Sequence, residues 1–254
     1  DSTSDPPPRP IREKTLRSGA RDPIHRKSRF YDNVIAWRRR KLAADLDLEI
    51  ICPYFQKQKK TCDISYWKQN IIESFWDNDT GIFIDDLSPE SRTQKLFSAD
   101  SMIVLSTGFL NLEDNTDRQM LVRIYEYIVA QGLDNPLPLR YAVSDQHKRL
   151  YPVVRMCATS YMGETHWSHW GMEYIKGLIM LSSHDAGYIQ IARNALKKYT
   201  QNIEKYGGYP ELYDTDGIPY ETWCYKSMLH TGWVVNYEQA RMMLNHARSG
   251  SRSL

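Results

Sequence analysis

The sequence has 254 residues, of which 41% are hydrophobic and 25% are charged, the usual proportions for a soluble globular protein. Its formal net charge of +2 is close to neutral, so the composition indicates neither nucleic acid nor a membrane surface as a partner. The cysteines Cys52, Cys62, Cys157 and Cys224 are widely spaced, which argues against a metal site or a disulfide framework, and we expect no cofactor.

Tryptophan and tyrosine are abundant, with 7 Trp and 17 Tyr against only 6 Phe. Aromatic rings with a polar edge suit a carbohydrate site, because the ring faces pack on sugar C–H surfaces while the OH and NH groups reach hydroxyls. A tyrosine-rich helical core explains the same composition equally well. The sequence contains no signal peptide and no apolar run of transmembrane length, which favours the cytoplasm, although its polar start resembles that of an internal fragment.

Residues 1–29 are rich in Pro, Ser and Arg, locally basic and poor in large apolar side chains. We predict an extended arm without regular secondary structure, because the prolines between positions 6 and 10 exclude a helix there. The alternative of a nucleic-acid-binding arm lacks support, since aromatic side chains are absent until Phe30.

From Asp32 onward, apolar residues recur at helical spacing and predict a helical body over residues 30–248, followed by a tail over 249–254. Asp32 or Asn33 is the predicted N-cap of the first helix, Asp63 of the second and Thr116 of a later one. The predicted helices cover about 32–58, 63–75, 98–109, 116–131, 168–184, 186–205 and 221–247.

Three segments between these helices stand out. Residues 76–86 combine an Asn-Asp-Thr-Gly turn with an Ile-Phe-Ile run and predict a small β-hairpin. Residues 133–165 contain few helix signals and predict a long ordered loop, which in a compact domain is usually functional. Residues 162–171 place two tryptophans and two histidines at a helix start, which fits either a sugar-binding wall or ordinary packing at a helix N-terminus.

The loop from Gly207 to Gly217 carries the main candidate catalytic group. Its sequence, Gly-Gly-Tyr-Pro-Glu-Leu-Tyr-Asp-Thr-Asp-Gly, is stiff on both sides of Glu211, because Pro210 restricts the approach and Asp216 begins a turn. A carboxylate held rigidly among tyrosines suits a general base that positions one water against a sugar ring. A solvated glutamate in an acidic turn is the alternative.

This loop, followed by Trp223 and by His-Thr-Gly-Trp at 230–233, resembles the carboxy-terminal signature of inverting glycoside hydrolases built on an (α/α)6 toroid. The Phe-Trp-Asp segment at 75–77 resembles a second element of these six-hairpin enzymes. Their nearest family is glycoside hydrolase family 63, with its processing α-glucosidases and mannosylglycerate-hydrolase-like members. Residues 2–9, Ser-Thr-Ser-Asp-Pro-Pro-Pro-Arg, are similar to the family's Ser-Gly-Leu-Asp-Asp-Tyr-Pro-Arg but depart at the Gly, the second Asp and the Tyr.

The resemblance implies an all-α fold of (α/α)6-toroid-like helical hairpins, and the chain is too short for more than a partial toroid. It implies hydrolysis of an α-linked, glucoside-type bond with inversion, with Glu211 as general base and Asp5 as general acid; Glu164 and Glu173 are alternative acids. The substrate is then an oligosaccharide or glucoside, and another chain is a possible source of the missing amino-terminal helices. The substrate-binding residues so implied are Trp167, His169, Trp170, Tyr213, Asp216, Trp223 and Trp233.

Two other classes of protein remain open. Sugar epimerases and isomerases use the same toroid with paired histidines for proton transfer, and His166, His169 and His230 are available for this. A non-catalytic carbohydrate-binding or scaffold protein derived from a glycosidase fits the short chain and the departures within residues 2–9.

Overall fold

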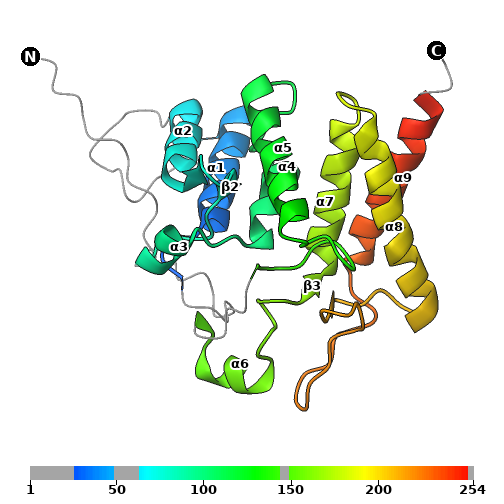
Figure 1. Ribbon diagram of the computed structural model, residues 1–254. Helices are drawn as coiled ribbons and strands as arrows, with labels where there is room; N and C mark the ends of the chain where they lie inside the picture. The colour runs from blue at the N-terminus through cyan, green and yellow to red at the C-terminus, as the bar shows by residue number, and fades with distance from the viewer. Residues whose placement is uncertain (1–25, 49–62, 144–148, 251–254) are drawn as a thin grey trace, which may run out of the picture.

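Helices make up most of the secondary structure in the described part of the chain, which comprises residues 26–48, 63–143 and 149–250 of the computed structural model (Figure 1). The helices are α1 (Phe30–Asp45), α2 (Ile64–Phe75), α3 (Pro89–Gln94), the 3-10 helix η1 (Ala99–Met102), α4 (Ile103–Ser106), α5 (Asn115–Ala130), α6 (Pro152–Cys157), α7 (Ser168–Leu181), α8 (Gly187–Tyr206) and α9 (Val234–Gly250). The strands are β1 (Trp76–Asp77), β2 (Ile82–Phe83), β3 (His166–Trp167) and β4 (Leu212–Tyr213).

The predicted all-α class with a small β-hairpin is confirmed. Strands β1 and β2 form the hairpin and pair antiparallel, with Trp76 opposite Phe83. A second two-stranded ladder joins distant parts of the chain, because β3 pairs antiparallel with β4, and Trp167 lies opposite Leu212. This ladder is central to the candidate site described below.

Helix α7 is the centre of one half of the molecule. It packs against α8, α9, α4 and η1, and its buried residues lie all around its axis. A helix surrounded in this way needs apolar side chains on every face, which explains the Ile175, Leu178, Ile179 and Leu181 run. Figure 1 shows α7, α8 and α9 standing side by side, with α1, α2 and α5 forming the other half. Loops and α6 gather at one end of the helices.

Two predicted helix boundaries are wrong. Helix α1 ends at Asp45 and not near residue 58, and Asp47 has a left-handed φ of 52°. Leu42 and Leu46, which continue the apolar spacing, are 41% and 66% exposed, so their side chains add little packing to stabilise this end of the helix. Helix α9 begins at Val234 and not at residue 221, because isolated β-bridges occupy the preceding segment: Pro219 with Tyr213, Glu221 with Lys226, and His230 with Tyr209.

The helix caps follow the prediction in one case of three. Asp63 caps α2 by accepting hydrogen bonds from the amides of Ser65 and Tyr66, as predicted. The cap of α5 is Asp114 and not Thr116, and the cap of α1 is Arg29, one turn before the predicted Asp32 or Asn33. Short helices α3 and α6 were not predicted; α3 begins with Ser88 as cap and proline in its first turn.

Residues 26–29, which we assigned to the arm, belong to the helical body. Arg26 and Ser28 are each 5% exposed, and the Lys27 carbonyl accepts a hydrogen bond from the Leu87 amide at 2.8 Å. These four residues are not helical, in agreement with the prediction. The rest of the predicted arm, including Asp5, lies outside the described residues.

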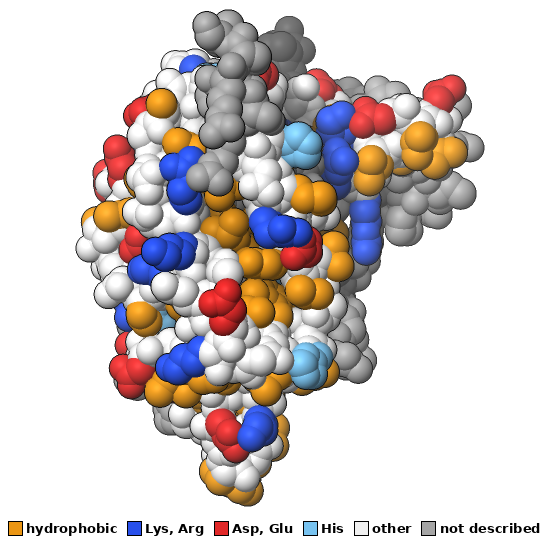
Figure 2. Space-filling model, turned by 90° about the vertical axis from the view of Figure 1, so that its right-hand side faces the viewer, with side chains coloured by type: hydrophobic (Ala, Val, Ile, Leu, Met, Phe, Trp, Pro, Cys, Tyr) orange, Lys and Arg blue, Asp and Glu red, His pale blue; other side chains and the backbone are white. Residues whose placement is uncertain are grey.

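The outer side of α8 and α9 exposes apolar side chains to solvent. These include Ile191, Val234, Val235 and Met242, and Figure 2, which views that side, shows hydrophobic side chains gathered near the middle of the face. Within residues 26–48, 63–143 and 149–250, no helix combines the length and the hydropathy needed to span a membrane.

Gly171 in α7 provides a stability test of the packing around this central helix. A Cβ atom there would overlap the Pro138 carbonyl oxygen and the hydroxyl of Tyr199, which donates a hydrogen bond to that same oxygen. We therefore expect Gly171→Ala to lower the free energy of unfolding by about 1–3 kcal/mol, even though alanine has the higher helix propensity.

Urea unfolding monitored by circular dichroism measures this change. Gly232→Ala is the matched control, because no heavy atom lies within 4 Å of the Cβ position at Gly232. Equal stability of the two variants would contradict the close approach at Gly171.

Candidate functional site

The backbone around Glu211 is fixed on both sides. Helix α8 ends at Tyr206 and is capped by Gly207, which has a φ of +66° and so takes the left-handed conformation that favours glycine. The Glu211 amide donates to the Met228 carbonyl at 2.8 Å, and the Glu211 carbonyl accepts from the Ser168 amide at 3.1 Å. The loop is therefore hydrogen-bonded to the start of α7 and to residues that follow β4.

The Glu211 carboxylate is half-buried and contacts tyrosine hydroxyls. Its Oε2 accepts a hydrogen bond from the Tyr225 hydroxyl at 2.8 Å. The Tyr161 hydroxyl lies near the same carboxylate, and burial together with the Glu211 charge raises the pKa of Tyr161 to about 12. Burial and the same carboxylate raise the pKa of Tyr225 as well. Both phenols consequently remain neutral beside the carboxylate.

Aromatic rings extend from these tyrosines along the start of α7. The Tyr161 ring lies 4.9 Å from the Trp167 ring, edge to face, and Trp233 lies 5.9 Å from Trp167. The His169 ring lies 4.5 Å from Trp233 and 4.1 Å from Trp170. We call these five residues and Tyr225 the aromatic group. It adjoins Glu211 because β3, which contains Trp167, pairs with β4 directly after Glu211.

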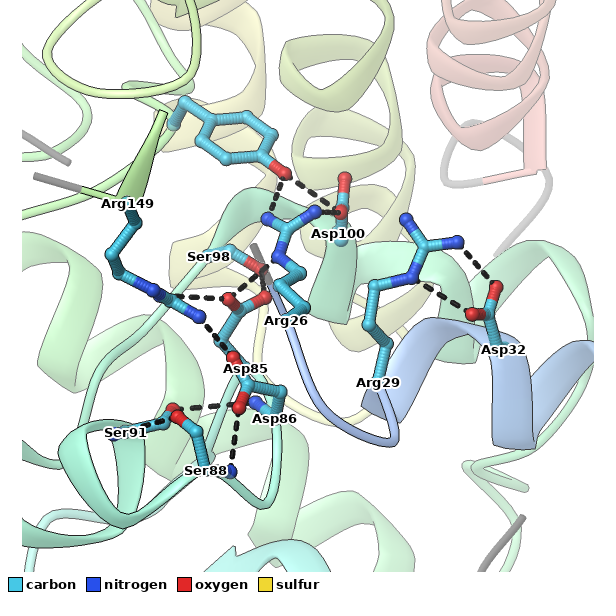
Figure 3. Close-up of polar contacts among 11 residues, drawn as sticks. Arg26, Arg29, Asp32, Asp85, Asp86, Ser88, Ser91, Ser98, Asp100 and Arg149 are labelled. Atoms are coloured by element: carbon cyan, nitrogen blue, oxygen red, sulfur yellow. Dashed lines mark hydrogen bonds and ion pairs between the residues drawn. The ribbon is translucent and has the colours of Figure 1, made fainter. Parts of the chain in front are cut away.

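A buried network connects Arg26 and Arg149 with Asp85 and Asp100 (Figure 3). The Arg26 Nε atom is 2.8 Å from Asp85 Oδ2, and Arg26 Nη1 is 3.6 Å from Asp100 Oδ2. The Tyr141 hydroxyl donates to Asp100 Oδ2 at 2.7 Å, and the Tyr141 ring lies 5.8 Å from the ring of Trp167. Tyr141 thus connects the network to the aromatic group.

The two aspartates that contact Arg26 have opposite electrostatic environments. Burial opposes ionisation of Asp85, but the charges of Arg26 and Arg149 outweigh it, and the pKa of Asp85 is lowered. At Asp100, burial and the nearby charge of Asp85 outweigh the attraction of Arg26, and the pKa is raised. Asp100 is therefore a carboxyl group whose environment favours its protonated form.

The structure brings together four of the predicted substrate-binding residues and separates three. Trp167, His169, Trp170 and Trp233 belong to the aromatic group described above. Tyr213 is completely buried and packs against Tyr199, with ring centroids 6.0 Å apart. Asp216 is exposed at the tip of its turn, where its amide donates to Asp214 Oδ1 at 2.9 Å. Trp223 is 75% exposed and donates from its indole nitrogen to the Met156 carbonyl.

None of the three carboxyl groups predicted as the general acid is shown next to Glu211 in the described part of the chain. Asp5 lies outside the described residues. Glu173 is buried on α7 and forms an ion pair of 2.6 Å with Lys176, and Glu164 is half-buried in the loop before β3.

The histidines of this region are kept neutral by their surroundings. Burial lowers the pKa of His166 to about 4, and burial together with the charge of Lys176 lowers the pKa of His169 to about 3. The Nδ1 atom of His169 is buried without a hydrogen-bond partner in the described part of the chain.

This leads to a pH prediction. The His166 and His169 ring signals in NMR spectra should not titrate between pH 8 and pH 5, whereas histidines of the unfolded chain should titrate near their usual pKa of ~6.5. A midpoint between pH 6 and pH 7 for either residue in the folded protein would contradict the described burial.

Sequence comparisons identify no family: neither a scan of family models nor a search of curated proteins finds a match. Among solved structures, the chain is similar to a GH63 mannosylglycerate hydrolase from Thermus thermophilus, crystallised in complex with Tris. The two are 14% identical with a TM-score of 0.45, and the match covers 85% of this chain and 45% of that one. The chain spans less than half the length of that hydrolase, and a likeness this weak carries no functional argument.

Proposed function

We propose that this protein is a glycoside hydrolase that cleaves an α-linked, glucoside-type bond with inversion, and that Glu211 is its general base. The observation that carries the proposal is the placement of one half-buried carboxylate on a fixed loop, hydrogen-bonded by Tyr225 at 2.8 Å and adjoining a group of aromatic rings. Such rings can stack on the C–H face of a sugar while the carboxylate faces a water molecule.

In this mechanism Glu211 removes a proton from water as the water attacks the anomeric carbon. The Tyr225 and Tyr161 hydroxyls orient the carboxylate, so that its free lone pairs remain directed at the water. Trp233, which is only partly buried, supplies the stacking surface, and the buried Trp167 ring supports it with its centroid 5.9 Å away. Inversion requires an acid on the opposite side of the bond, with the two carboxyl groups roughly 6.5–9.5 Å apart.

For the acid we propose Asp5, on the resemblance of its segment to family 63. Asp100 is a second candidate, favoured by one specific observation: it contacts Tyr141, whose ring adjoins Trp167, and its pKa is raised. A general acid must hold a proton at the pH of the reaction, and a raised pKa serves that role.

Two variants distinguish these acids. Fluoride leaves without protonation, so loss of the acid should reduce hydrolysis of a disaccharide by about 10²-fold or more while sparing a glycosyl fluoride. If Asp5→Asn shows this pattern, Asp5 is the acid; if Asp100→Asn shows it, Asp100 is. Equal loss on both substrates would assign the residue a role in folding or binding.

Release of reducing sugar from a panel of α-glucosides and oligosaccharides tests the reaction class. A hydrolase releases a new reducing end, whereas an epimerase or isomerase converts a sugar without net hydrolysis. The low pKa values of His166 and His169 make them poor proton donors near neutral pH, which disfavours the isomerase. A non-catalytic binding protein would retain sugar and release nothing, and the same panel would reveal it by binding without turnover.

A further inference from the structure

Two thiols that are far apart in the sequence meet beside the candidate site. Cys157 is the last residue of α6, and Cys224 lies in the loop that leads from β4 to α9. The Cys224 thiol is near enough to Cys157 to raise the pKa of the Cys157 thiol. Both cysteines are reduced in the structure; Cys157 is half-buried and Cys224 is exposed, so solutes can reach the pair.

Neighbouring hydrogen bonds hold the two segments together. The Thr222 hydroxyl donates to the Cys157 carbonyl at 2.7 Å, and the indole nitrogen of Trp223 donates to the Met156 carbonyl at 3.2 Å. These contacts come from the two residues before Cys224 and reach the two last residues of α6. The closeness of the thiols is therefore built into the packing of α6 on this loop, and does not depend on the two side chains alone.

We propose that Cys157 and Cys224 form a reversible disulfide that fixes the loop carrying Tyr225. The reaction uses a small-molecule disulfide such as oxidised glutathione. The Cys224 thiolate attacks one sulfur of the oxidant and releases one glutathione thiolate, which takes up a proton. The Cys157 thiolate then attacks the mixed disulfide at the Cys224 sulfur and releases the second glutathione. Two protein thiols are oxidised, and one glutathione disulfide is reduced to two thiols.

The exposure of the two cysteines sets this order. Cys224 is the more accessible sulfur, and the raised pKa of Cys157 lowers its thiolate fraction, so the first attack comes from Cys224. Once the mixed disulfide forms, Cys157 is already held beside it by the contacts of Thr222 and Trp223 with the end of α6. The second step is consequently intramolecular, which favours the protein disulfide over a lasting glutathione adduct.

The disulfide would act on the site through the next residue. Tyr225 follows Cys224 directly and donates the 2.8 Å hydrogen bond to Glu211. Fixing Cys224 to α6 restricts the backbone that positions this hydroxyl. The formation of the disulfide rests on the hydrogen bonds that hold residues 222–223 against the end of α6, whereas its effect on turnover rests on the proposed function of Glu211.

Peptide mapping of the full chain tests the proposal. The reduced protein is incubated with oxidised glutathione, free thiols are alkylated with iodoacetamide, and the digest is analysed by mass spectrometry. We expect one cross-linked peptide pair containing Cys157 and Cys224, loss of alkylation at both residues, and full recovery of alkylation after reduction with dithiothreitol. Glutathione adducts on either cysteine without the cross-link would overturn the proposal.

Two cysteine variants test which thiols form the cross-link and which of them reacts first. The C52S/C62S variant removes the other two cysteines of the sequence, which lie outside the described residues, and it should give the same cross-link. The wild-type chain is mapped in parallel in case this variant fails to fold. In C157S, glutathione should remain attached to Cys224, because no second thiol resolves it; an unmodified Cys224 would contradict the order of attack. Since mapping needs no substrate, its result stays separate from any failure of the proposed hydrolase activity.

Discussion

Glu211→Gln is expected to reduce the turnover of an α-glucoside by about 10²-fold or more, the usual scale for losing a positioned acid or base. The amide keeps the size of the side chain and can still accept the hydrogen bond from Tyr225. It cannot take a proton from water. Sugar affinity should therefore stay nearly unchanged, and the loss should appear in kcat, as steady-state kinetics together with titration calorimetry on the variant will measure.

Glu221→Gln is the matched control for this experiment. Glu221 lies in the neighbouring loop, is 58% exposed at its side chain and pairs with Lys226 at 3.1 Å. An exposed ion pair of this kind contributes little, so the control should keep full activity and stability. Full activity in Glu211→Gln, or an equal loss in Glu221→Gln, would rule out Glu211 as the base.

Asp85→Asn should have the largest effect on stability, with a loss of about 3–5 kcal/mol in the free energy of unfolding. Asp85 accepts hydrogen bonds from Arg26 at 2.8 Å, from Arg149 at 3.2 Å and from the Ser98 hydroxyl at 2.8 Å (Figure 3). The side chains of Arg26, Asp85 and Arg149 are at most 6% exposed. Replacing the carboxylate leaves two buried guanidinium groups without this counter-charge, far from compensating water.

Denaturant unfolding at pH 7 measures the loss, with Asp45→Asn as control. Asp45 forms an exposed pair with Lys41 at 2.8 Å, so its substitution should change stability by less than about 0.5 kcal/mol. A loss below about 1 kcal/mol for Asp85→Asn would contradict the network as described.

The same variant has a defined pH dependence. The folded-state pKa of Asp85 is lowered, so the carboxylate contributes stability above its unfolded pKa of ~3.9 and loses that contribution as the pH falls through the folded value. The stability difference between wild type and Asp85→Asn should consequently shrink as the pH falls below about 4.

Local sequence patterns predicted most of the helices. They failed where tertiary contacts determine the first or last residue of a helix. Asp63 and the apolar spacing after it located α2, because a cap and an amphipathic stripe act within one helix. The same spacing predicted α1 too long, since the exposed side chains of Leu42 and Leu46 add little packing. It predicted α9 too early, because β-bridges such as Tyr209 with His230 take the backbone before Val234 out of the helix.

Contacts between distant parts of the sequence also form the candidate site, and local patterns did not predict them. Glycine and proline around Glu211 predicted a loop, and the structure has a loop there. The tryptophans at the start of α7 fitted either a sugar-binding wall or ordinary packing, and Trp167 and Trp170 are buried, at 7% and 6% exposure. Tyr161 and Tyr225 were missed, since a tyrosine that reaches a carboxylate far along the chain leaves no local pattern. Only the flanking structure indicates it: the β3–β4 pairing places Trp167 beside Glu211, and Tyr161 packs on Trp167.

Asp100 was missed for a related reason. Its contacts with Arg26 and Tyr141 join residues from three separate segments, and its raised pKa arises from burial that no sequence window contains. A buried aspartate flanked by alanine and serine gives no signal of its own in the sequence.

The anomeric configuration of the first product tests the central claim most directly. An α-configured glucoside is mixed with the protein, and proton NMR spectra are recorded before mutarotation equilibrates the released sugar. Because a base-activated water attacks the face opposite the leaving group, the account predicts that the β-anomer appears first and the α-anomer later. Early release of the α-anomer would contradict the assignment of Glu211 as the base of an inverting hydrolase.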